Sequence, residues 1–69
     1  MSFDYSKLRG RIVEIFGTQQ ALANAMGISE RTLSLKLHNK IAWTQVDIEK
    51  AIGLLKLTPD DIRLYFFTH

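Results

Sequence analysis

The chain has 69 residues, a formal net charge of +2 and no cysteine, with an ordinary share of apolar and charged side chains. This composition excludes a disulfide framework and a thiolate zinc site. No apolar run approaches the roughly 18 residues that a membrane-spanning helix needs, and the stretch MSFDYSKLRG lacks the apolar core of a secretory signal. We therefore expect one domain over residues 1–69, without membrane association, in the cytoplasm.

The first predicted helix covers about residues 5–16. Its apolar residues recur at helical spacing and form one stripe: Leu8, Ile12, Ile15 and Phe16. Gly17 is expected to end the helix, because glycine takes the left-handed conformation at low cost. The basic residues of this helix are expected to form a solvated face: Lys7, Arg9 and Arg11.

Two short helices are predicted next, on either side of Gly27. Thr18 is the expected N-cap of the second helix, and its inward-facing residues are Leu22, Ala25 and Met26. Ser29 is the expected N-cap of the third helix, which buries Leu33 and Leu37 and leaves Lys36 exposed. This helix should end near His38 and Asn39, because asparagine tolerates the left-handed conformation.

Two further helices are predicted after a loop at residues 40–43. Trp43 is expected to plug the core beneath this loop, together with Ile41 and Val46. Residues 44–47, TQVD, are typical of a capping box, and residues 48–55 continue as a fourth helix. The stretch TPDD at residues 58–61 starts a short fifth helix that runs to about Phe66. No segment has the alternation of a strand, so we expect an all-α, compact five-helix bundle.

Residues 18–37 meet the demands of two helices that cross steeply at a short turn. Ala23 is small where the helices touch, Gly27 allows a positive φ in the turn, and Leu33 packs back onto the earlier helix. With Thr18 and Gln19 at the start, and KLTPDDIRLYFF at the end of the chain, the sequence resembles the lambda-repressor-like helix-turn-helix family. Within that family it is most similar to the small Cro-like proteins of phages and prophages.

The resemblance implies that the third helix lies in the major groove of double-stranded DNA. Carried onto this sequence, the base-contacting residues are Ser29, Glu30, Arg31, Ser34 and Leu35. The phosphate-contacting residues are Thr18, Gln19, Lys36, Asn39, Lys40, Thr44 and Gln45. Basic residues without neighbouring acids at positions 5–13 and 31–46 favour this interpretation, and scattered solvated charge is the alternative. Glu30 has an alternative role at the positive end of the helix dipole.

Two functions remain open from the sequence. The first is a Cro-like transcriptional repressor, of which two copies bind the half-sites of a DNA operator. The second is a protein-interaction module that modulates a partner phage repressor and binds DNA weakly, which Glu30 and the apolar C-terminal residues would suit. Those residues either form a homodimer contact or pack on the first helix: Tyr65, Phe66 and Phe67. No catalytic, metal or cofactor site is expected, because no constellation of suitable residues occurs.

Overall fold

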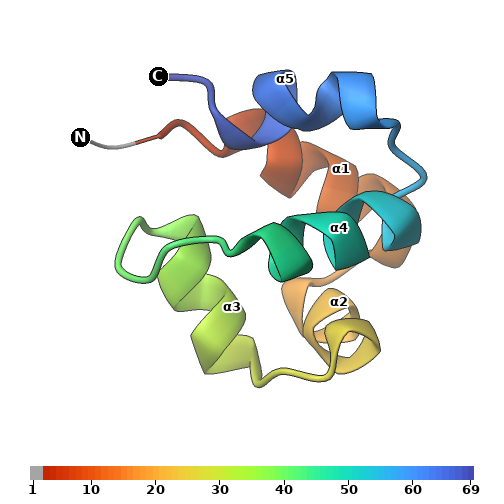
Figure 1. Ribbon diagram of the computed structural model, residues 1–69. Helices are drawn as coiled ribbons and strands as arrows, with labels where there is room; N and C mark the ends of the chain where they lie inside the picture. Colours follow the sequence, from red (N-terminus) through yellow and green to blue (C-terminus); the bar gives the residue numbers. More distant parts are fainter. Residues whose placement is uncertain (1–2) are drawn as a thin grey trace.

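Five α-helices and one 3₁₀ turn make up the computed structural model, which describes residues 3–69 (Figure 1). The helices are α1 (Ser6–Phe16), α2 (Gln19–Met26), α3 (Glu30–Leu37), α4 (Gln45–Leu54) and α5 (Ile62–Phe66), and the 3₁₀ turn η1 (Pro59–Asp61) precedes α5. The expected all-α, five-helix fold is therefore confirmed. None of the described helices is both long enough and apolar enough to cross a membrane.

Local capping groups set where the helices begin and end. The hydroxyl groups of Thr18, Ser29 and Thr44 each accept a hydrogen bond from a backbone N–H of the helix that follows. Gly17 and Gly27 have φ values of 84° and 78°, in the left-handed region that ends a helix without strain. These caps confirm the predicted end of α1, both ends of α2, and the predicted starts of α3 and α4.

The core lies where α2 meets α1, α3 and α4. Ala23 is fully buried at the α2–α3 crossing, and its carbonyl accepts a hydrogen bond from the Ile28 N–H at 3.0 Å. Leu33 packs into the same core, as predicted for a helix-turn-helix. The prediction for Ala25 is wrong, because this residue is exposed. It lies two positions after Ala23, which turns it about 200° around the helix.

The arginines of α1 are not a solvated face. The guanidinium of Arg9 donates to the Leu37 carbonyl at 3.0 Å, and that of Arg11 donates to the Leu55 carbonyl at 2.9 Å. These carbonyls stand at the C-terminal ends of α3 and α4, where backbone acceptors lack a partner within the helix and a positive charge is favourable. Only Lys7 remains exposed as expected.

The segment before α1 is held against the loop that connects α3 and α4. Asn39 has a φ of 61°, and its side-chain amide bonds both backbone groups of Phe3, each at 2.9 Å. The Asp4 N–H in turn donates to the Thr68 carbonyl. Figure 1 accordingly shows the segment just before α1 beside the C-terminal end of the chain.

Two substitutions distinguish the stability that comes from the left-handed turn at Asn39 from the stability that comes from the hydrogen bonds between the Asn39 amide and Phe3. Asn39→Gly keeps the left-handed turn and loses both bonds, so we expect a loss of about 1 kcal/mol in the free energy of unfolding. Asn39→Ala loses the same bonds and keeps a Cβ in the left-handed region without the polar side chain that lets asparagine adopt it, which costs about 1 kcal/mol more. Urea titration followed by circular dichroism measures both, and wild-type stability in Asn39→Gly would show that the amide contributes nothing.

Candidate functional site

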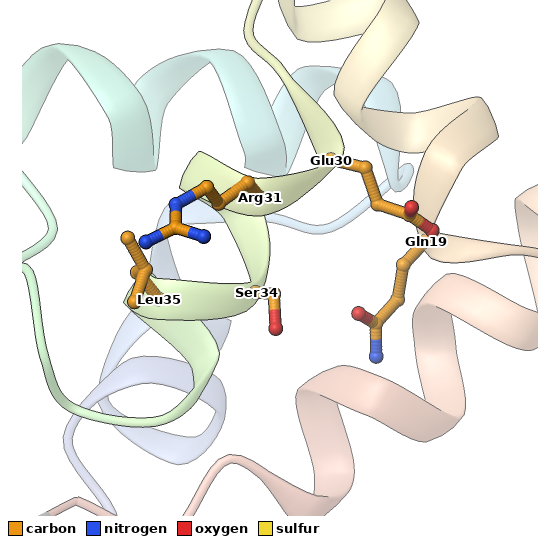
Figure 2. Close-up of a pocket in the computed structure, with 5 residues that line it drawn as sticks. All are labelled: Gln19, Glu30, Arg31, Ser34 and Leu35. Atoms are coloured by element: carbon orange, nitrogen blue, oxygen red, sulfur yellow. The ribbon is translucent and has the colours of Figure 1, made fainter.

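An open depression lies on the outer face of α3. It is lined by Gln19 from α2 and by Glu30, Arg31, Ser34 and Leu35 from α3. Figure 2 shows Gln19 and Glu30 on one side of the depression and Arg31 and Leu35 on the other. Four of the five predicted base-contacting residues therefore meet in one place. The fifth, Ser29, points its hydroxyl at the backbone and side chain of Thr32 as the cap of α3.

The charge of this depression is balanced. Arg31 is exposed and supplies one positive charge, and Glu30, also exposed, supplies one negative charge. Arg31 can donate to guanine, whereas a carboxylate beside the phosphates of a duplex is repelled. The lining is thus suited to a few directed polar contacts and does not attract polyanions strongly.

Lys36 is buried, and the expectation that it is exposed is wrong. Its relative exposure is 6%, and its ammonium group donates to Asp47 Oδ2 at 2.7 Å and to the Ala42 carbonyl at 3.1 Å. Lys36 lies three positions after Leu33, on the same side of α3, so its stem packs inward.

The Asp47 carboxylate belongs both to this ion pair and to the capping box of α4. Burial by itself would raise the pKa of the carboxyl. The hydrogen bonds from Lys36 and Thr44 and the attraction of the ammonium group outweigh burial, so the pKa lies below its ordinary value of 3.8. Asp47 is therefore ionised at neutral pH and neutralises Lys36.

Three of the six other predicted phosphate contacts have side chains that are engaged within the fold. The hydroxyl groups of Thr18 and Thr44 cap helices, and the Asn39 amide is bonded to Phe3. Within residues 3–69, no side-chain hydrogen bond involves the three remaining residues, which are Gln19, Lys40 and Gln45. Lys40 is the only cation among them.

A second surface lies around Trp43 and Phe67, which line two neighbouring depressions. One depression lies towards the N-terminal segment and is completed by Phe3, Tyr5, Asn39, Ile41, Ala42 and Phe66. The other lies towards α4 and α5 and is completed by Gln45, Ile48, Glu49 and Ile62. We call these two depressions together the aromatic surface. Sequence reasoning found only its C-terminal residues, Phe66 and Phe67, and missed the rest, in part because it expected Ile41 to be buried, whereas this residue is 40% exposed.

The three C-terminal aromatic residues have different roles. Phe67 is 46% exposed, and its ring lies 5.5 Å from that of Phe3. Tyr65 is half-buried. Phe66 is 1% exposed and packs edge-to-face on Trp43 with the ring centroids 5.0 Å apart. Of the two alternatives for these residues, Phe66 therefore follows packing within the chain, because its ring belongs to the core.

Two smaller expectations concern Val46 and the histidines. Val46 is 59% exposed, not buried as expected, because it lies two positions before the buried Ile48 and so faces away from the core. His38 ends α3, as expected, with Nδ1 2.7 Å from the Ser34 carbonyl oxygen. Among residues 3–69, no three metal-ligating side chains come together.

Comparison with known proteins identifies a family and a similar structure. The family model described as "Protein of unknown function (DUF739)" matches residues 1–69, so the chain belongs to this family. The solution structure of the modulator of repression (MOR) of the temperate bacteriophage TP901-1 from Lactococcus lactis is 55% identical in sequence, with a TM-score of 0.85. The match covers 97% of this chain and 90% of the other. No curated protein matches the chain.

Proposed function

We propose that this member of the DUF739 family modulates a phage repressor by binding to it, and that it does not act mainly as a Cro-like repressor. The observation that carries the proposal is the 55% identity, over 97% of the chain, to a protein described as a modulator of repression. Because the match extends over nearly the whole chain, it spans the segments that form the α3 depression and those that form the aromatic surface. The role needs no catalysis and is exercised in the cytoplasm, beside the phage DNA.

The distribution of positive charge supports a role other than tight DNA binding. Affinity for a duplex rises with the number of phosphates that lysine and arginine neutralise. Arg9 and Arg11 are bonded to helix-end carbonyls, and Lys36 is paired with Asp47. Glu30 offsets Arg31 at the α3 depression. The helix-turn-helix thus has few cations left for the DNA backbone.

The aromatic surface is the part of the molecule best suited to a protein partner. Two exposed apolar side chains line it, Ile41 and Phe67. Apolar patches of this kind on a small protein usually mark an interaction site, and buried aromatic anchors supply much of the binding energy of interfaces. We assign this surface to the repressor of the phage or prophage that carries the chain.

Replacing Phe67 by alanine tests this assignment. We expect the affinity for the purified repressor to fall at least about 30-fold, the loss typical of an aromatic hot spot. Isothermal titration calorimetry measures it. Val13→Ala is the matched control, because Val13 is 60% exposed and lines neither depression of the aromatic surface. An unchanged affinity in Phe67→Ala would contradict the assignment.

Direct operator binding by α3 is the second candidate, favoured by the meeting of Gln19, Glu30, Arg31, Ser34 and Leu35 in one outward-facing depression. In this case two copies would read the half-sites of a palindromic operator, with Tyr65 and Phe67 available for a homodimer contact. An Arg31→Ala variant distinguishes the two candidate functions when its affinity for duplex DNA and its affinity for the repressor are both measured. Specific duplex binding that weakens steeply with salt and disappears in Arg31→Ala would favour operator reading. Modulation through the aromatic surface predicts an unchanged repressor affinity in this variant.

A further inference from the structure

The backbone on both sides of Trp43 is attached to one ion pair. Before Trp43, the Ala42 carbonyl accepts a hydrogen bond from Lys36 Nζ at 3.1 Å. After it, the Thr44 N–H donates to Asp47 Oδ2 at 3.1 Å. The same Oδ2 lies 2.7 Å from Lys36 Nζ. The ion pair therefore fixes the two peptide groups that flank Trp43.

The indole ring has no polar contact of its own to hold it. Trp43 Nε1 is buried and has no hydrogen-bond partner within residues 3–69. The ring lies against Phe66, and more loosely against Tyr5 at 6.3 Å between centroids. The Lys36 ammonium stands 6.0 Å from the indole centroid, within the range of a cation–π attraction. The orientation of the Trp43 indole therefore depends on packing against the neighbouring rings and on the two anchored peptide groups.

A lysine at this buried position calls for an explanation other than stability. Removing an ammonium group from water is costly, and an apolar side chain of similar volume is often as stable or more stable. A buried pair does, however, fix geometry, because its hydrogen bonds are short and directional. Here the fixed geometry is that of the loop between α3 and α4, where Trp43 lines both depressions of the aromatic surface.

We propose that Lys36 is a positioning residue for partner binding: through Asp47 and the Ala42 carbonyl it holds Trp43 in place and so shapes the aromatic surface before the repressor arrives. This inference rests on the proposed function. A surface that is already ordered avoids the entropy loss of ordering a side chain and its loop during association. The contribution of Lys36 is then to affinity, with little effect on the stability of the fold.

Lys36→Met tests the proposal, because methionine fills a similar space and cannot bond Ala42 or Asp47. Trp43 is the only tryptophan in the chain, so its fluorescence reports on this loop alone. We expect an unchanged or higher thermal midpoint, a faster decay of Trp43 fluorescence anisotropy, and an affinity for the phage's repressor that is about tenfold weaker. Lys40→Met is the matched control, since it removes the same charge from an exposed residue of the same loop and should behave as wild type.

Two results would overturn the proposal. One is wild-type anisotropy and wild-type repressor affinity in Lys36→Met, and the other is an equal loss of affinity in Lys40→Met, which would indicate a general effect of charge. If the wild-type chain binds no repressor, the proposed function fails, and the anisotropy still decides whether Lys36 orders Trp43. If Lys36→Met does not fold, Lys36→Leu replaces it, because leucine is also apolar, bonds neither Ala42 nor Asp47, and leaves no unpaired ammonium buried.

Discussion

Asp47→Ala is expected to lower the free energy of unfolding by about 3 kcal/mol, because it leaves a buried lysine without its counter-ion. The side chain of Lys36 is 7% exposed and would retain only the Ala42 carbonyl as a partner. The change also removes the Asp47 side of the capping box at the start of α4. A domain of this size has a total stability on the order of 5 kcal/mol, so a large share of the molecules would unfold on mild heating.

The comparison with Lys36→Met makes this prediction specific to the ion pair. Removing the lysine leaves a partly exposed carboxylate that still accepts hydrogen bonds from Thr44, so the free energy of unfolding should stay at the wild-type value or rise slightly. Urea unfolding of both variants at pH 7, followed by circular dichroism, measures the difference. Equal losses would show that the capping box or simple packing, and not the unpaired ammonium, determines the result.

The pH dependence of the same variants gives an independent measurement. The pKa of Asp47 is lower in the folded chain than its ordinary value of 3.8. Its contribution to stability is therefore complete above that value, and it is lost as the pH falls through the lower pKa of the folded state. We expect the deficit of Asp47→Ala relative to wild type to be constant near neutral pH and to shrink in strong acid. A deficit that grew on acidification would contradict this assignment.

Helix boundaries could be predicted because the groups that fix them are local. Thr18, Ser29 and Thr44 each bond a backbone N–H three positions later. Gly17 and Gly27 end their helices through their own backbone conformation. Because each signal is complete within a few residues, the all-α fold class and the order of its five helices follow from the printed sequence.

The roles of the basic residues could not be predicted, because their partners are far along the chain. Lys36 meets Asp47 across 11 positions, Arg9 meets the Leu37 carbonyl across 28, and Arg11 meets the Leu55 carbonyl across 44. Nothing local distinguishes these side chains from solvated ones. Their burial depends on how α1, α3 and α4 pack, which spacing within one helix does not determine.

The candidate site was predicted on one face and only in part on the other. The family resemblance named Glu30, Arg31, Ser34 and Leu35 on α3, and they do line one depression. On the other face the sequence pointed only to the C-terminal aromatic residues. The aromatic surface combines the N-terminal segment, the loop before α4 and the end of α5, which only the tertiary structure brings together. A helix-turn-helix supports DNA reading and protein binding alike, so the layout by itself did not choose between them.

Phe66→Ala is expected to have the largest effect on stability of any change at the C-terminus, a loss of about 3–5 kcal/mol. Phe66 is among the largest fully buried side chains, and its ring packs edge-to-face on Trp43, which lines the aromatic surface. Its removal opens a cavity between α5 and the rest of the core, which the short helix α5 cannot close by shifting alone. Thermal unfolding followed by circular dichroism measures the loss.

Phe67→Ala is the matched comparison, because the same side chain is removed one position later from a ring that is 46% exposed. We expect a stability loss of about 1 kcal/mol or less, since much of the ring already faces water. The two variants thus separate the energy of folding from the energy of binding: Phe66→Ala should weaken the fold, whereas Phe67→Ala should fold normally and lose the repressor. A Phe66→Ala protein with wild-type stability would mean that this ring is not part of the core, and the assignment of Phe67 as the contact residue would have to be revised with it.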